Sequence, residues 1–364
     1  MDKGLGIYIH IPFCKRKCDY CAFVSQCDFS LEKRYIEALC REIRERGTPD
    51  TVTTVYVGGG TPSTIESGRL CEVFDCLRAS FTFSTDCEIT VEANPESVTE
   101  DFCGAIKKSG VNRVSLGLQS SDDEILKSIG RIHRASDFPK AVDRLRNVGI
   151  TNISGDIILG LPGQDEEKVL CDADFLMSAH VKHISAYALQ VEEGTPLFKR
   201  GAKVDPDYQA DLYDAFYSRI SRGGFVRYEV SNFAVPGYES RHNLKYWIRA
   251  PYLGFGAAAH SFYDGKRGYN TSDVRAYCDG KRDYTETVLS AADLREERIM
   301  LALRTVYGLD LAEFERSCGE NLLVSKSKEI DRLLRGGFIE IDGGALRATD
   351  KGIYVLSSII TELI

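Results

Sequence analysis

Three cysteines stand within eight residues near the start of the chain, at Cys14, Cys18 and Cys21. Thiolates are soft ligands that suit iron-sulfur clusters or zinc, and the Lys and Arg residues between the first two cysteines favour deprotonated sulfur. A structural zinc site needs four closed ligands, and no nearby pair of cysteines or histidines supplies the fourth. Three ligands leave one position open, as in a four-iron cluster with one iron free. The spacing therefore predicts an open [4Fe-4S] site, with a structural zinc module as the alternative.

The composition limits the classes of function and the compartment. The chain has 364 residues with 46 Lys and Arg against 54 Asp and Glu, and its net charge of -8 with no basic tract argues against a nucleic-acid partner. No apolar run approaches the ~20 residues that cross a bilayer. The start carries no secretory signal, so we expect a cytoplasmic protein. We therefore expect the twelve cysteines to stay reduced, with the nine others packing singly.

Six short apolar or β-branched runs alternate with segments of helical period in the first half of the chain. They cover residues 6–11, 53–57, 88–93, 111–117, 153–159 and 183–189. This alternation is the βαβ pattern, which builds a parallel sheet with helices outside. We expect an α/β fold whose sheet is either open or curled into a barrel, with ligands at the carboxyl ends of the strands.

Glycines and polar residues gather at the ends of these runs. In chain order they are Gly58, Gly59, Gly60 and Thr61 after the second run, Glu92 in the third, Gln119 at the fourth, Arg131 in the next loop and Asp156 in the fifth. Glycines let the backbone approach a polar ligand, and a carboxylate accepts hydrogen bonds from amines or hydroxyls. A tight turn explains the glycines equally well, and a solvated acid explains Glu92.

The chain divides into three parts on its residue pattern. Residues 1–227 carry the strand and helix alternation, residues 228–290 are an aromatic, loop-rich connecting segment, and residues 291–364 form a C-terminal module. The module shows three helices, a hairpin across Gly343 and Gly344, and a last helix after Thr349, which is the order of a winged-helix module. Because it is not notably basic, we expect it to pack or to contact protein.

The CxxxCxxC spacing after a strand, with the aromatic Tyr20 just before the last cysteine, resembles the radical S-adenosylmethionine superfamily. The resemblance implies a partial (β/α)6 radical SAM barrel with a [4Fe-4S] cluster on the three cysteines. It also implies S-adenosylmethionine at the open iron, where an electron from the cluster cleaves a carbon-sulfur bond.

The strand-end residues, in this order, resemble the oxygen-independent coproporphyrinogen III oxidase branch from Tyr8 through the winged-helix tail. This resemblance implies one S-adenosylmethionine on Tyr8, Gly59, Glu92 and Ala188. A second, seen in the oxidase, would touch Tyr20, Gly60, Thr61, Gln119, Arg131 and Asp156.

Two features depart from the oxidase. The oxidase has another Cys two residues after the third ligand, where this chain has Phe23, and it has a long N-terminal arm, where only seven residues precede Tyr8. The segment from Arg241 to Trp247 is instead similar to the HNxxYW signature of the HemW-type heme chaperones, which are implicated in delivering heme to respiratory enzymes.

This HNxxYW segment has side chains that suit a porphyrin. His242 could ligate heme iron, Tyr246 and Trp247 could stack on the macrocycle, and Arg241 or Lys245 could meet its propionates. A hydrogen-bonded corner of the core is the equal alternative for His242, and His260 and His10 compete as ligands.

The resemblance predicts a heme carrier with a membrane-bound respiratory heme protein as acceptor, met by peripheral membrane contact. A coproporphyrinogen-decarboxylating enzyme is the alternative, and the sequence leaves the oligomeric state open.

Overall fold

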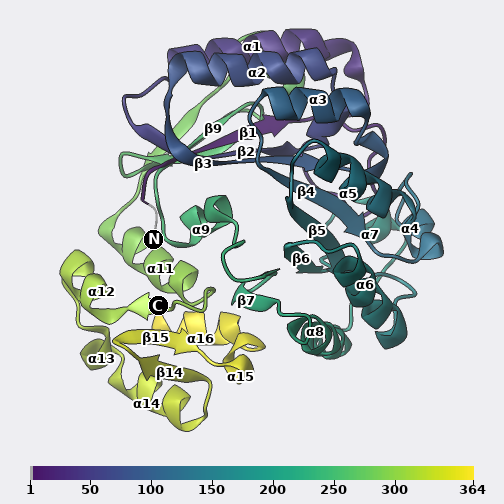
Figure 1. Cartoon of the computed structure of the whole chain (residues 1–364). Coiled ribbons are helices and arrows are strands. Elements are labelled where there is room, and N and C mark those ends of the chain that lie inside the picture. The colour runs from purple at the N-terminus through teal and green to yellow at the C-terminus, as the bar shows by residue number, and fades with distance from the viewer. Residues whose placement is uncertain (1–2) are drawn as a thin grey trace.

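The structure, a computed structural model, describes residues 3–364. Its centre is a twelve-stranded sheet in which the six predicted strands lie side by side in chain order and run parallel (Figure 1). They are β1 (Leu5–Ile11), β2 (Thr51–Gly59), β3 (Thr82–Ala93), β4 (Arg113–Gln119), β5 (Asn152–Leu159) and β6 (His183–Ala188). The predicted α/β fold with a parallel sheet is confirmed, and the sheet is curved (Figure 1).

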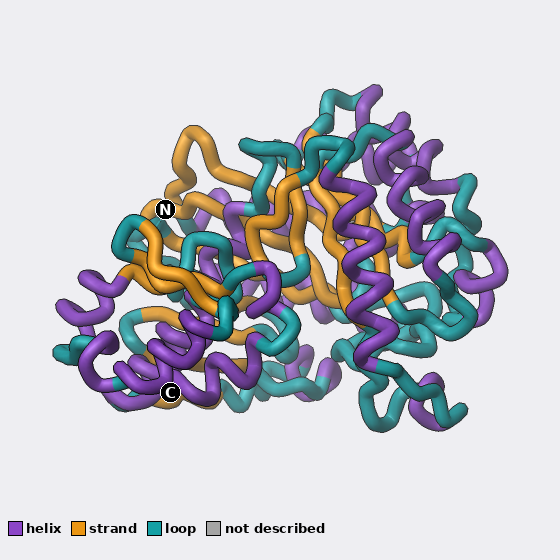
Figure 2. Tube along the Cα trace, turned by 90° about the horizontal axis from the view of Figure 1, so that it is seen from below, coloured by secondary structure: helices purple, strands orange, loops and turns teal. Residues whose placement is uncertain are grey.

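Helices follow these strands, and the longer ones cover the outer face of the sheet (Figures 1 and 2). They are η1 (Phe29–Leu31), α1 (Glu32–Glu45), η2 (Pro62–Thr64), α2 (Ser67–Ser80), η3 (Pro95–Ser97), α3 (Glu100–Lys108), α4 (Asp123–Ser128), α5 (Asp137–Asn147), α6 (Glu166–Ser178), α7 (Pro196–Lys199) and α8 (Pro206–Ser221). A Thr or Asp side chain caps the first turn of α3, α4, α6 and α8 by accepting backbone N–H groups. These caps fix where each helix begins.

The two faces of the parallel strands differ in chemistry, because successive residues of a strand point to opposite sides. Val55, Ile89 and Val114 are buried in the core that the outer helices share. The inner face is polar instead. One row across it, in direct register, is Tyr8, Tyr56, Thr90, Arg113 and Asn152. The inside of the curved sheet is therefore lined with groups that can bind a polar ligand.

The aromatic stretch after α8 extends both edges of the sheet. β7 (Val226–Glu229) and β8 (Asn232–Ala234) add antiparallel strands beyond β6. β9 (Tyr252–Phe255) pairs parallel with β1, and β10 (His260–Tyr263), β11 (Lys266–Tyr269) and β12 (Thr285–Val288) follow it antiparallel. α9 (Arg241–Trp247) and α10 (Val274–Cys278) lie in the connections.

The C-terminal module has its own core and a small sheet in the order β13, β15, β14. Its elements are α11 (Ala291–Ala302), β13 (Leu309–Asp310), α12 (Leu311–Cys318), α13 (Leu322–Ser325), α14 (Ser327–Arg335), β14 (Ile339–Asp342), β15 (Ala345–Ala348), α15 (Asp350–Ile353) and α16 (Leu356–Leu363). Backbone bonds from Val230 to Arg304 and from Val306 to Tyr228 join it to the barrel. Within residues 3–364, no helix has the length and apolar character that crossing a membrane requires.

Candidate functional site

The loop after β1 carries the three cysteines, and backbone hydrogen bonds hold it at several points. The N–H of Cys14 donates to the carbonyl of Gln26 at 3.0 Å, and that of Asp19 donates to Ile129 at 2.9 Å. The N–H of Cys21 donates to Cys18 at 3.1 Å. The three thiols are free and partly buried. The fold therefore presents all three on one short, anchored loop.

A continuous line of hydrogen bonds runs from the first thiol to the second across neighbouring strand ends. The Thr61 hydroxyl donates to Cys14 Sγ at 3.5 Å and accepts from Asn94 Nδ2 at 3.3 Å. Arg131 donates to Asn94 Oδ1 at 2.8 Å through one nitrogen and to Cys18 Sγ at 3.6 Å through the other. Asn94 was not among the residues predicted for the site. Its signal in the sequence is its place before a proline at the end of the third strand.

The thiols need this support because burial raises the pKa of Cys14 and of Cys21. The Thr61 hydroxyl lowers the pKa of Cys14, while Lys17 and Arg131 lower that of Cys21, so donors and cations favour thiolates. Such a donor set fits a negatively charged cluster. In residues 3–364, no three His, Cys, Asp or Glu side chains meet closely enough to hold a single metal ion. The thiols of a four-iron cluster bind separate iron atoms and have no such requirement.

Replacing Arg131 by Met should weaken the hold on a reconstituted cluster, because Cys18 and Asn94 lose their donors. We expect iron to leave the Arg131→Met protein for a chelator about tenfold faster, the order of one hydrogen bond to a charged group. Anaerobic absorption decay measures the rate. The exposed Arg134, changed to Met, is the matched control. Equal rates in the two variants would remove Arg131 from the cluster site.

Glu92 lies on the inner face of β3, held by two donors. The Tyr56 hydroxyl donates to one carboxylate oxygen at 2.7 Å and the Gly59 N–H to the other at 3.1 Å. Burial raises the pKa of Glu92 to about 7. A Cβ at Gly58 would lie 2.8 Å from this carboxyl group, and one at Gly59, where φ is 111°, would lie 2.5 Å from His10 Nδ1. Glycine is therefore required at both positions, because Glu92 and His10 approach the backbone too closely for a side chain. The Glu92 carboxyl group is placed to accept a hydrogen bond from a ligand.

His10 connects this strand end to the cysteine loop. Its Nε2 lies 2.8 Å from the Val24 carbonyl, which only accepts, so Nε2 carries the hydrogen. Its Nδ1 then accepts from the Tyr8 hydroxyl at 3.0 Å. Both ring nitrogens of His10 are thus engaged in positioning the loop.

The other predicted residues lie on the neighbouring strands or in the loops that follow them. Asp156 accepts from the Ser115 hydroxyl and the Ser154 hydroxyl, each at 3.0 Å, and burial raises its pKa. Gln119 ends β4 with φ 71°, and Ala188 ends β6 on the surface. Gly60 and Tyr20 lie in the loops beside the thiols, where a Cβ on Gly60 would be 2.7 Å from the Phe13 carbonyl.

His242 lies away from the thiol loop, toward the amino-terminal end of β2, against which α9 packs. Its Nδ1 bonds the Thr54 hydroxyl and its Nε2 the Tyr246 hydroxyl, each at 2.8 Å, and its ring stacks on Tyr56. Its backbone N–H donates to Glu88 at 2.9 Å, and the residue is 1% exposed. In this conformation the ring is a hydrogen-bonded corner of the core, and neither nitrogen is free for iron while α9 stays in place.

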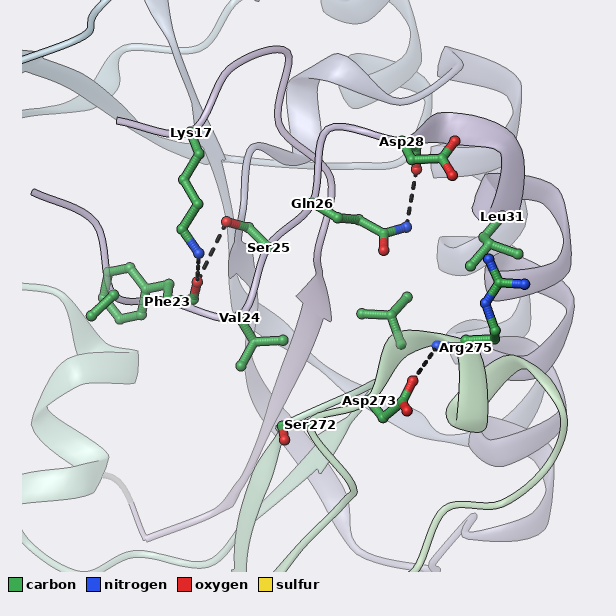
Figure 3. Close-up of a pocket in the computed structure, with 12 residues that line it drawn as sticks. Lys17, Phe23, Val24, Ser25, Gln26, Asp28, Leu31, Ser272, Asp273 and Arg275 are labelled. Carbon is green, nitrogen blue, oxygen red and sulfur yellow. Dashed lines mark hydrogen bonds between the residues drawn. The ribbon is translucent and has the colours of Figure 1, made fainter. Parts of the chain in front are cut away.

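An open hollow of about 470 Å³ lies beside the thiol loop, between it and the start of α10 (Figure 3). Lys17 Nζ donates to the Phe23 carbonyl at 3.0 Å and so braces the backbone just beyond the third cysteine. The Phe23 side chain is 69% exposed, so packing does not demand an apolar residue where the oxidase branch has a cysteine. The loop is therefore approachable from this side.

Known families and proteins are similar to this chain. The family described as Radical SAM superfamily matches residues 8–176, and the HemN C-terminal domain matches residues 289–355. Heme chaperone HemW of Mycobacterium tuberculosis is 34% identical over 99% of this chain and 94% of its own length. Heme chaperone HemW of Escherichia coli is 31% identical over 98% and 97%. The solved structure of coproporphyrinogen III oxidase (HemN) from Escherichia coli shares the fold, with a TM-score of 0.87, 20% identity, and coverage of 100% of this chain and 90% of that one.

Proposed function

Because this chain belongs to the radical SAM superfamily, and within it to the family of its full-length relatives named heme chaperone HemW, we propose that it binds heme and delivers it to respiratory heme proteins. The full-length similarity to proteins of that name carries the proposal. The thiol loop supports it, since its donors and cations fit an open cluster. The acceptor would be a membrane-bound complex, met by peripheral contact.

In this proposal Cys14, Cys18 and Cys21 hold a [4Fe-4S] cluster. Such a cluster supplies an electron and one iron position open to a ligand. Glu92 then accepts an amine or hydroxyl hydrogen of S-adenosylmethionine, and Gly59 keeps side chains out of its path. Tyr8 and Ala188 are the other residues proposed to contact this S-adenosylmethionine.

A second S-adenosylmethionine would use Tyr20, Gly60, Thr61, Gln119, Arg131 and Asp156. Thr61 and Arg131 already donate to cluster thiols, so they would serve both groups.

Two histidines compete for the heme iron. His260, on β10, is exposed and stacks on Tyr269, with ring centroids 5.3 Å apart. Ligation by His242 requires α9 to release the ring from Thr54 and Tyr246. Substituting each histidine by Ala therefore separates a surface site from one that needs α9 to open.

An oxygen-independent coproporphyrinogen III oxidase is the second candidate. The observation in its favour is that Gln119, Arg131 and Asp156, the residues of the oxidase's second cofactor, all lie about the strand ends of one barrel. Phe23 stands against it, since the oxidase motif has a cysteine there.

Reconstituted protein should bind heme stoichiometrically and release little carbon dioxide from coproporphyrinogen. The assay incubates it anaerobically with S-adenosylmethionine and a reductant, once with heme and once with coproporphyrinogen. It compares the shift of the heme absorption band with carbon dioxide release. We expect His260→Ala to alter the band in the folded protein. Catalytic carbon dioxide release would replace the carrier with the oxidase, and transfer to an apo-acceptor completes the test of delivery.

A further inference from the structure

A line of hydrogen bonds inside the barrel links Asp156 to a tyrosine beyond the last parallel strand. The Ser154 hydroxyl donates to Asp156 at 3.0 Å, and its oxygen lies 2.8 Å from His183 Nδ1. His183 Nε2 lies 2.8 Å from the Tyr228 hydroxyl. Ser154 and His183 have no exposed surface, and Tyr228 is 3% exposed. No water from outside competes for these bonds.

The donor and acceptor groups in this line of hydrogen bonds allow only one order of donation, from Tyr228 toward Asp156. An ionised Asp156 only accepts, so it takes the single hydroxyl proton of Ser154, whose oxygen must then accept from His183. Burial first, and the nearby Arg113 second, hold the pKa of His183 well below its usual value, so the ring is neutral with one N–H. That hydrogen is on Nδ1, and Nε2 accepts from the Tyr228 hydroxyl.

The far end of the line lies at α9. The Tyr228 oxygen accepts the backbone N–H of Ser240 at 3.2 Å. Ser240 is the N-cap of α9, since its side chain accepts from Asn243. One set of bonds therefore joins the start of α9 to the Asp156 carboxylate on β5.

We propose that His183 is a positioning residue for Asp156. In its Nδ1–H tautomer it keeps the Ser154 hydroxyl donating a hydrogen bond to the ionised carboxylate, which then presents an oxygen in a fixed position to a donor of the bound ligand. The step from Asp156 to a ligand rests on the proposed function. The line itself rests on the distances above.

Other charged or titratable groups face Asp156 from the strands around it. Arg113 on β4 lowers its pKa, while Asp156 acts with burial to raise the pKa of Glu92 on β3 and of Tyr56 and Tyr187 on β2 and β6. Among the described residues, the buried Nε of Arg113 has no hydrogen-bond partner. Arg113 therefore offsets charge without fixing the orientation of Asp156, which is left to the serine hydroxyls.

Nitrogen NMR of protein labelled in its six histidines tests the tautomer directly. We expect His183 to show a protonated Nδ1 and an unprotonated Nε2, with the signal assigned through its correlation to its own backbone in the unsubstituted chain. A protonated Nε2 would reverse the line and overturn the proposal. This measurement uses the unsubstituted chain, so it stays decisive if the variants fail to fold.

Two substitutions of His183 separate positioning from packing. The amide nitrogen of His183→Asn falls near the place of Nδ1 and keeps a donor for Ser154, whereas that of His183→Gln reaches the place of Nε2 and does not. The Gln variant should raise the pKa of Asp156 by about one unit in carbon NMR and weaken S-adenosylmethionine binding about tenfold, and the Asn variant should retain both. If only the titration changes, the line stands and the ligand role of Asp156 fails. If neither changes, His183 does not position Asp156.

Discussion

A protein with Cys14, Cys18 and Cys21 all replaced by Ala should take up no iron or sulfide on anaerobic reconstitution and stay colourless. Only these thiols have three-ligand spacing, and Thr61 and Arg131 donate to two of them. Iron and sulfide analysis, with the visible spectrum, measures the effect. The matched control replaces three cysteines that are not buried and stand singly, Cys27, Cys171 and Cys318. The control should reconstitute as the unsubstituted chain does.

The triple substitution should leave the fold intact, which makes the loss interpretable. The loop is held by backbone bonds, such as that from Cys14 to Gln26, which alanine keeps. We expect its unfolding midpoint to stay close to that of the control. An unchanged iron content would exclude these thiols as ligands, and stoichiometric zinc in place of iron would indicate a structural metal module.

The elements of the barrel were predictable from the sequence because their signals are local. Each parallel strand is a short run whose outer residues, such as Val55 and Val114, must be apolar to pack against helices. The strand-end residues could be found for the same reason, since they follow such runs directly. Asn94 could not, because its role depends on Thr61 and Arg131 arriving from two other segments.

The stretch after residue 227 resists sequence reasoning for a different reason. β9 is four residues long and pairs with β1, with Gly6 opposite Tyr252. Because the two strands are so far apart in the chain, no local hydrophobic period predicts β9. His242 illustrates the same limit. Its spacing to Tyr246 and Trp247 suggests a porphyrin site, but Thr54 from β2 supplies the partner that makes it a buried corner.

Glu92→Gln should raise the stability of the ligand-free protein and lower its affinity for S-adenosylmethionine. Burial raises the pKa of Glu92 from 4.5 to about 7, so the folded state holds a proton that the unfolded state has lost between those values. The unfolding free energy contributed by this group is therefore fully present below pH 4.5 and falls as the pH rises to about 7. The amide has no charge to bury. At pH 8 the variant should be more stable by ~1–2 kcal/mol, below the ~3 kcal/mol of the full shift because the carboxyl group is only partly buried.

The ligand should respond in the other direction, because S-adenosylmethionine loses an ionised acceptor for its donor groups. We expect binding to the reconstituted protein to weaken about tenfold or more, the order of a hydrogen bond to a charged group. Denaturant unfolding of the metal-free chain at pH 5 and pH 8, and the electron paramagnetic resonance response to S-adenosylmethionine, measure the two effects. Glu229, whose pKa burial also raises to about 7, shares the pH window, so the variant should remove only part of the decline. Glu100→Gln, on α3 at the surface, is the control that should change neither. A loss of stability at pH 8 would contradict the expected cost of burying the Glu92 charge. Unchanged binding of S-adenosylmethionine would exclude Glu92 from the ligand site.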